Sequence, residues 1–275
     1  MSEAAPLSAT GAAGGDQRPI TVVTGASSGL GLEFARLAAA EGQPLLLVAR
    51  RTDRLEALAA ELRDRHGVPV ACRTCDLADR GQTEALAREL ADMPVGILVN
   101  NAGFGLRGRI LRQDPAELAG MVDVNITAVT LLARAVAPGM VQRGGGGILN
   151  VASLAAYQPG PNMAVYYASK SYVLSFSEAL WEEFRRYGIR VTALCPGPTE
   201  TEFSTRAGAA STPLFTGRGN KAPDARSVAE AGWQALARGR RVVVPGFGQK
   251  VYAGLSALLP RRPILSMVRK VNGAR

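Results

Sequence analysis

The chain has 275 residues, of which 47% are hydrophobic, and a formal net charge of +9 at pH 7. This length suits one α/β domain with a full buried core. The basic residues are scattered, with no lysine run and no basic stripe interleaved with aromatic residues, so nucleic-acid binding is not expected and an anionic ligand or surface fits the charge better.

The first 18 residues are rich in Ala, Gly and Ser and predict a disordered lead-in rather than a signal peptide. The sequence has no uninterrupted apolar segment of about 20 residues, so no membrane-spanning helix is predicted. Cys72, Cys75 and Cys195 are too few for a disulfide framework, which predicts a reducing, cytoplasmic location. The lone His66 is expected at a helix end, and no metal site is predicted.

In chain order, residues 20–23 predict a buried strand that leads through three glycines into a helix at 32–40. Gly25 allows a tight turn, Gly29 lets the backbone approach a diphosphate, and Gly31 lets helix and strand pack closely. The free N–H groups of the helix then face the anion. A tight turn without a ligand is the alternative, and the missing Gly-Lys-Ser/Thr argues against a P-loop.

The rest of the chain alternates between strand and helix patterns. Later strands are predicted at 44–49, 68–74, 95–99, 148–153, 189–195 and 241–244. Helices are predicted at 53–65, 80–91, from Pro115 to a kink or end at Pro138, 162–187 and 225–238, with a polar loop at 199–222. Strict alternation predicts a doubly wound parallel sheet in three α/β/α layers, Rossmann-like, as one catalytic domain over 19–246.

Five short motifs stand at the ends of these elements. In order and spacing they resemble the short-chain dehydrogenase/reductase family, and they are most similar to its NADP-dependent, broad-range branch. The motifs are Thr24-Gly25-x3-Gly29-x-Gly31, Asn100-Asn101-Ala102-Gly103, Ser153, Tyr166-x3-Lys170 and Pro196-Gly197.

Tyr166 and Lys170 are four residues apart on a predicted helix and therefore share a face. A nearby ammonium should lower the pKa of the tyrosine, which could then exchange a proton with a substrate oxygen. Ser153 could hydrogen-bond the same oxygen. The resemblance implies that Asn125 holds a relay water and that Lys170 binds ribose. Tyr167 is the competing tyrosine, and only the family pattern selects Tyr166.

The end of the second predicted strand carries Arg50 and Arg51 where NAD enzymes have an acid. Arginines there can bind a 2′-phosphate, which predicts NADP(H), with Arg50 as the main contact and Arg51 second. Two solvated arginines are the alternative. The resemblance implies further cofactor contacts at Gly25, Ser27, Ser28, Gly29, Leu30, Gly31, Asp76, Leu77, Asn101, Ala102, Gly103, Tyr166, Lys170, Pro196, Gly197, Thr199 and Thr201.

Together these residues predict an NADP(H)-dependent oxidoreductase that transfers a hydride between the nicotinamide and a carbonyl or secondary alcohol. A non-catalytic NADP-binding regulator or scaffold on the same fold is the alternative. Residues 154–162 and the loop after Phe203 should build an apolar substrate pocket. Family resemblance implies a homo-oligomer, either a dimer or a tetramer.

Residues 247–275 form an apolar and basic extension without an acidic residue, and prolines at 260 and 263 divide it into two short helical pieces. Its apolar side should pack on the domain or on a second subunit beside the substrate cleft. The alternative is a peripheral anchor with its arginines on anionic lipid.

Overall fold

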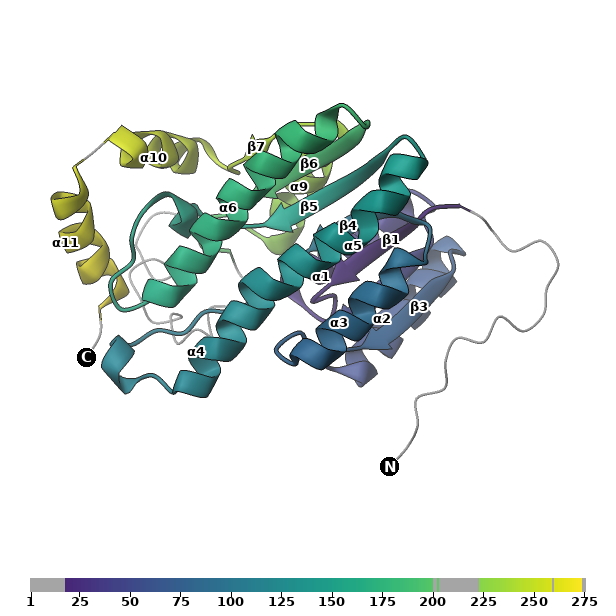
Figure 1. Ribbon diagram of the computed structural model, residues 1–275, viewed down its shortest axis with the longest axis horizontal. Helices are drawn as coiled ribbons and strands as arrows, with labels where there is room; N and C mark the ends of the chain where they lie inside the picture. The colour runs from purple at the N-terminus through teal and green to yellow at the C-terminus, as the bar shows by residue number, and fades with distance from the viewer. Residues whose placement is uncertain (1–17, 200–201, 203–222, 259, 274–275) are drawn as a thin grey trace.

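The computed structural model describes residues 18–199, 202, 223–258 and 260–273. Nearly all of the predicted lead-in, most of the predicted loop at 199–222 and the predicted contact Thr201 therefore lie outside the described residues. Within the described part, one sheet forms the middle layer and helices cover both of its faces (Figure 1).

All seven strands are parallel to their neighbours, in the order β3-β2-β1-β4-β5-β6-β7. This confirms the predicted doubly wound fold. The strands are β1 (Ile20–Thr24), β2 (Leu45–Ala49), β3 (Val70–Thr74), β4 (Val95–Asn100), β5 (Gly146–Val151), β6 (Ile189–Leu194) and β7 (Val242–Val243).

The helices form the two outer layers and the C-terminal extension. Their bounds are α1 (Gly29–Ala40), α2 (Thr52–His66), α3 (Arg80–Ala91), α4 (Pro115–Val122), α5 (Val129–Gln142), α6 (Ala164–Arg185), α9 (Ala225–Ala237), α10 (Phe247–Leu258) and α11 (Arg261–Asn272). Two single turns of 3₁₀ helix, Ile110–Arg112 and Leu154–Tyr157, and a π-helical segment, Asp123–Ala128, complete the set.

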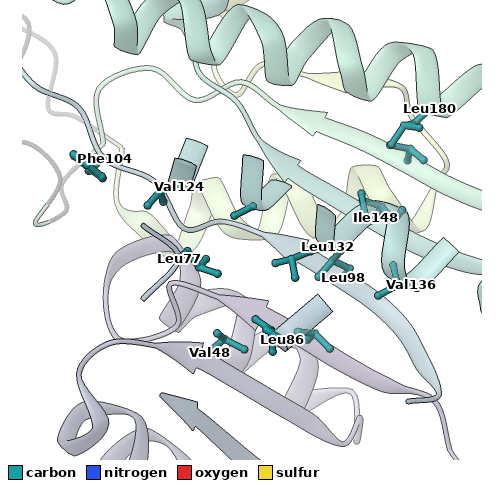
Figure 2. Close-up of a cluster of buried hydrophobic side chains, with 14 of the residues drawn as sticks. Val48, Leu77, Leu86, Leu98, Phe104, Val124, Leu132, Val136, Ile148 and Leu180 are labelled. Atoms are coloured by element: carbon teal, nitrogen blue, oxygen red, sulfur yellow. The ribbon is translucent and has the colours of Figure 1, made fainter. Parts of the chain in front are cut away.

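Successive residues of each strand point to opposite faces and build two separate cores. On one face, Val48, Leu98 and Ile148 pack with Leu86 of α3 and Leu132 of α5 (Figure 2). On the other face, the alternate strand residues pack against α1, α2 and α9. The continuous apolar strands predicted for a sheet covered on both sides are therefore explained.

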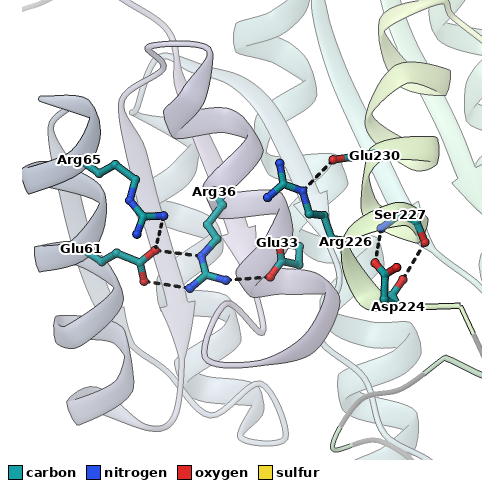
Figure 3. A network of polar contacts seen from close by, with 8 residues as sticks. All are labelled: Glu33, Arg36, Glu61, Arg65, Asp224, Arg226, Ser227 and Glu230. Atoms are coloured by element: carbon teal, nitrogen blue, oxygen red, sulfur yellow. Dashed lines mark hydrogen bonds and ion pairs between the residues drawn. The ribbon is translucent and has the colours of Figure 1, made fainter.

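Charged side chains join the helices of the second layer (Figure 3). The guanidinium of Arg36 on α1 donates two hydrogen bonds, both 3.0 Å long, to the carboxylate of Glu61 on α2, and a third to Glu33 at 2.9 Å. Asp224 caps α9 by accepting a hydrogen bond from the Ser227 backbone N–H at 2.8 Å. The pair between Arg36 and Glu61 therefore joins α1, which follows the glycine turn, to α2.

The long helix predicted from Pro115 differs from expectation, because Pro138 lies inside α5 and does not end it. The helical run Pro115–Gln142 is long and apolar enough to cross a membrane by length and composition alone. Half of its most apolar window is buried, and α5 packs on α3 and β4, which is typical of a core helix. Glu117, Asp123 and Arg134 interrupt this run, so it is not the uninterrupted apolar segment that the sequence analysis looked for.

We expect Gly31→Ala to destabilise the fold by about 2 kcal/mol, because overpacking at a rigid contact has this magnitude. A Cβ at Gly31 would lie 2.3 Å from the carbonyl oxygen of Gly25. Gly254→Ala is the matched control, since a Cβ there meets nothing within 4 Å and should leave stability equal or slightly raised. Urea unfolding of both variants measures this, and equal midpoints would contradict the packing role of Gly31.

Candidate active site

The site begins where β1 and β4 end side by side. The Thr24 hydroxyl accepts hydrogen bonds from the backbone N–H groups of Asn101 and Ala102, at 3.0 and 3.1 Å, and donates to the Val99 carbonyl at 3.2 Å. The Asn101 side-chain amide donates in return to the Thr24 carbonyl at 2.9 Å. The two strand ends are therefore locked together at the point where the sheet order reverses.

The glycine turn follows β1 directly and lies next to these hydrogen-bonded strand ends. Gly25 and Gly29 have φ angles of +65° and +57°, a left-handed conformation that favours glycine. Ser28, the N-cap of α1, makes no side-chain capping bond, and the first turn of the helix carries no acid. The first N–H groups of α1 thus keep their capacity to bind an anion such as a diphosphate.

A cavity of about 1020 Å³ runs from this turn to the ends of β5 and β6. Its size and its glycine-lined end fit a dinucleotide. All predicted contacts within the described residues line it except Gly31, which lies buried behind the turn. The predicted cofactor contacts that line it are Gly25, Ser27, Ser28, Gly29, Leu30, Arg50, Arg51, Asp76, Leu77, Asn101, Ala102, Gly103, Tyr166, Lys170, Pro196, Gly197 and Thr199, and the predicted catalytic residue Ser153 lines it as well.

The two predicted arginines have different surroundings. Arg51 donates hydrogen bonds to the hydroxyl groups of Ser27, at 3.1 Å, and Ser28, at 3.0 Å, so its guanidinium lies against the glycine turn. Arg50 is paired with Asp76 at 3.8 Å. The structure therefore brings Arg51 closer to the turn than Arg50.

Sequence analysis did not identify Glu202, which lines this end of the cavity, or its partner Arg54. The Glu202 carboxylate pairs with Arg51 at 2.9 Å and with Arg54 at 2.6 Å. Hydrogen bonds from these arginines lower the pKa of Glu202 to about 2. No local pattern pairs these residues, which lie about 150 positions apart.

Tyr166 and Ser153 meet at the other end of the cavity. Ser153 lies two residues after β5 as the N-cap of the 3₁₀ turn Leu154–Tyr157, and its hydroxyl accepts a hydrogen bond from the Ala155 N–H at 3.1 Å. Tyr166 comes from the first turn of α6, and its hydroxyl is hydrogen-bonded to Ser153. Two hydroxyl groups therefore face one spot in the cavity, which is the arrangement needed to bind and protonate an oxygen.

Lys170 lies one helical turn after Tyr166 and is buried. Its ammonium donates a hydrogen bond to the Val151 carbonyl at 2.8 Å and lies 6.0 Å from the centre of the Tyr166 ring. Burial lowers the pKa of Lys170 to about 8. This amine can therefore lose its proton close to neutral pH.

The predicted lowering of the Tyr166 pKa is wrong for the chain as described. Burial raises the pKa of Tyr166 to about 12, and the hydrogen bond with Ser153 opposes this only in part. Desolvation disfavours the phenolate more than the other groups favour it, since the Lys170 ammonium is turned toward the Val151 carbonyl.

Asn125 is buried in the π-helical segment and does not line the cavity. Its amide group exchanges hydrogen bonds with the backbone of Phe104, at 3.0 and 3.1 Å, and donates to the Ser169 hydroxyl at 3.0 Å. A Cβ at Gly103 would lie 3.1 Å from Asn125 Oδ1 and 3.3 Å from Lys170 Nζ. Asn125 and Lys170 therefore both lie close to Gly103, and Ser169, which sequence analysis missed, is hydrogen-bonded to Asn125.

The competing tyrosine, Tyr167, faces the C-terminal extension. Its hydroxyl donates to Asn272 Oδ1 of α11 at 3.3 Å, and the Asn272 amide donates to the Pro161 carbonyl at 3.0 Å. A Cβ at Gly160 would lie 2.2 Å from the Tyr167 ring, so only glycine fits there. Tyr167 thus holds α11 rather than meeting Ser153.

The helices α10 and α11 form one wall of the cavity, which supports the predicted packing of the extension on the domain. Ile264 and Val268 are buried in the core, and Arg107 donates to the Asn272 carbonyl at 2.5 Å. Tyr252 of α10 donates to the Gln158 side chain. Asn272 was not identified from the sequence, because a polar residue near a chain end has no distinguishing pattern. The wall residues are Tyr252, Met267, Val268, Val271 and Asn272.

Comparison with known proteins gives matches over most of the chain. The family described as short chain dehydrogenase matches residues 19–211. The chain is 39% identical over 216 residues to a sulfoacetaldehyde reductase of Chromohalobacter salexigens, covering 76% of this chain and 84% of that protein. It is 38% identical over 177 residues to a very-long-chain 3-oxoacyl-CoA reductase of Laccaria bicolor. That match covers 63% of this chain and 52% of the relative, so the chain spans about half of the length of that longer protein.

Among solved structures, a short-chain dehydrogenase from Sphingobium yanoikuyae in complex with NADPH superimposes with a TM-score of 0.78. Its sequence is 34% identical, and the match covers 94% of this chain and 99% of that one. The similarity therefore includes the C-terminal part of the chain as well as the sheet.

We expect the free energy of unfolding to rise between pH 8 and 10.5 through Lys170. In this window the unfolded chain binds a proton at Lys170, with a pKa of 10.5, and the folded chain does not, so raising the pH favours the folded state by up to about 3 kcal/mol. Urea unfolding at pH 7.5 and 9.5 measures the rise, below the range in which Tyr166 titrates. Lys170→Met should lack the rise and the exposed control Lys250→Met should keep it; equal slopes for the two variants would contradict the assignment.

Proposed function

This chain belongs to the short-chain dehydrogenase family, and on that premise we propose that it is an NADP(H)-dependent oxidoreductase acting on a carbonyl or secondary alcohol. The observation that carries the proposal is the hydrogen bond between Ser153 and the buried Tyr166 at the end of the cavity opposite the glycine turn. When bound, the nicotinamide supplies or accepts the hydride.

The residues of the chain handle the proton. Tyr166, protonated at neutral pH because of its raised pKa, donates to the substrate oxygen in reduction. Ser153 hydrogen-bonds the same oxygen and fixes its position. Lys170, with Asn125 and Ser169 behind it, provides the positive charge beside the tyrosine and an exit for the proton.

Binding of NADP(H) is supported by the arginines and by the NADPH complex of the Sphingobium yanoikuyae relative. Backbone N–H groups of the glycine turn would hold the diphosphate, and Arg51, with Arg50 and Arg54 nearby, would hold the 2′-phosphate. Arg51 is placed first because it already contacts the turn. Asp76 and Leu77 would flank the adenine, and Pro196, Gly197 and Thr199 the nicotinamide.

The substrate is a small molecule, and we propose an apolar ketone or secondary alcohol. Support comes from the apolar residues that line the cavity near Ser153, namely Leu154, Ala155, Met163, Met267, Val268 and Val271. The regulator or scaffold alternative is not favoured, because a protein without turnover has no need to gather Tyr166, Ser153 and Lys170 at one cavity.

We further propose a homo-oligomer that works in the cytoplasm and makes a peripheral membrane contact through its C-terminal extension. For the oligomer, the support is the exposed Tyr172 on α6, which stacks on the half-buried Phe176 with ring centres 5.6 Å apart. For the compartment, the support is that the three cysteines are unpaired thiols.

Replacing Tyr166 by Phe removes the proton donor and retains the ring. We expect Tyr166→Phe to lower kcat for carbonyl reduction at least about 100-fold, the usual effect of a general acid, with NADPH affinity nearly unchanged. Stopped-flow NADPH oxidation over a panel of aldehydes and ketones, with NADPH binding by fluorescence, measures both. Tyr167→Phe is the matched control and should keep turnover; loss there, with full activity in Tyr166→Phe, would overturn the assignment.

The arginines should set cofactor choice. We expect Arg51→Asp to weaken NADPH binding about 10- to 100-fold, since hydrogen bonds to charged groups contribute about 1.5–3 kcal/mol, and Arg50→Asp to weaken it less. NADH binding should change little, because NADH has no 2′-phosphate. Titration of all three proteins with both cofactors tests this, and an equal loss for NADPH and NADH would contradict a 2′-phosphate contact.

A further inference from the structure

Three segments at one end of the molecule leave apolar side chains exposed. They are α10, α11 and the 3₁₀ turn Ile110–Arg112 before α4, and Figure 1 shows α10, α11 and the chain before α4 on the same side, far from β3. Hydrogen bonds from Arg107, three residues before the turn, to the carbonyl oxygens of Asn272 and Gly273 join this part of the chain to the end of α11. We call these segments the C-terminal face.

Six of the nine large hydrophobic side chains exposed in the described part of the chain belong to this face. Along α10, Phe247, Val251 and Leu255 are spaced four residues apart and are 84%, 44% and 51% exposed, while Ala253 and Ser256 on the other side of the helix are buried. In the turn, Leu111 is 95% exposed beside Ile110, and α11 adds Met267. Large exposed apolar patches of this kind on a protein mark a surface that binds a partner or a membrane.

Cations surround these apolar side chains. None of the ion pairs among the described residues involves the cations of this face. Within their described residues, α10, α11 and the turn carry no acid, and the acids that follow the turn are Asp114, which caps α4, and Glu117 in its first turn. The exposed cations are Arg109, Arg112, Lys250, Arg261, Arg262, Arg269 and Lys270.

We propose that the C-terminal face docks on an anionic membrane, with the apolar side chains entering the headgroup region and the cations on lipid phosphate. Amphipathic helices with apolar and basic faces bind membranes in this way. A second copy fits less well, because a two-fold interface places the same cations opposite one another.

Docking here would also place the substrate cavity at the bilayer. Met267 is 44% exposed and lines the cavity, as do Val271 and Asn272 beside it. An apolar substrate dissolved in lipid could then reach Tyr166 without crossing water. This deepens the membrane contact and substrate class of the proposed function, but the binding itself does not depend on catalysis.

Co-sedimentation with phosphatidylcholine vesicles, with and without phosphatidylglycerol, tests the proposal on the full chain. The wild type should bind only the anionic vesicles. Each cation near an anionic surface contributes about five-fold in affinity, so Arg262→Glu with Lys270→Glu should lower it at least about 25-fold. Phe247→Ser with Leu255→Ser should lower it at every salt concentration, because the lost contact is apolar.

Matched controls come from the end of the sheet at which the strands begin, opposite the end that carries the cavity. Tyr187→Ser, just before β6, removes an exposed hydrophobic side chain, and Arg238→Glu, before β7, reverses an exposed charge; both should bind like the wild type. All variants should reduce a water-soluble ketone normally, which separates this result from the catalytic proposal. Absent binding, equal binding to both vesicle types, or loss of a dimer instead of vesicle binding in the α10 variant would overturn the proposal.

Discussion

The hydrogen bonds between Thr24 and Asn101 are the constraint on which the site depends. In this strand order the chain leaves β1 toward one edge of the sheet and later continues from β4 toward the other, so a crevice opens between the two strand ends. The Thr24 hydroxyl and the Asn101 amide close the base of that crevice. A Cβ at Gly25 would lie 2.8 Å from the side-chain amide nitrogen of Asn101. Only glycine therefore lets the turn pack against the hydrogen-bonded strand ends and lead into α1.

The catalytic end depends on a different irregularity, the π-helical segment between α4 and α5. A π-helical turn inserts a residue relative to an α-helix and so changes the direction of the side chains within it. Here it turns the Asn125 amide toward the Phe104 backbone and the Ser169 hydroxyl on α6. The loop that follows β4 is thereby tied to the helix that carries Tyr166 and Lys170, and both ends of the cavity are fixed relative to β4.

The sequence predicted what depends on local pattern. Apolar strand runs, alternation with helices and glycine spacing predicted the sheet and its order of elements. The family motifs predicted that Ser153, Tyr166 and Lys170 share one site. Contacts between distant segments could not be predicted in this way: Glu202 with Arg51 and Arg54, or Asn272 with Tyr167, are joined only by the fold. The predicted direction of the Tyr166 pKa shift was also wrong, because spacing on a helix reveals a neighbouring residue but not how far burial desolvates both groups.

That burial changes the role that chemistry assigns to Lys170. With its pKa raised to about 12, Tyr166 holds its proton at neutral pH and is ready to donate it. Once the proton is given to a substrate oxygen, a phenolate remains in surroundings that disfavour charge, and the ammonium one helical turn away is the positive group that can stabilise it. In the proposed mechanism, Lys170 therefore acts on the product of proton transfer rather than preparing the tyrosine beforehand. Its own lowered pKa then lets it pass a proton back near neutral pH, through the side of the site where Asn125 and Ser169 lie.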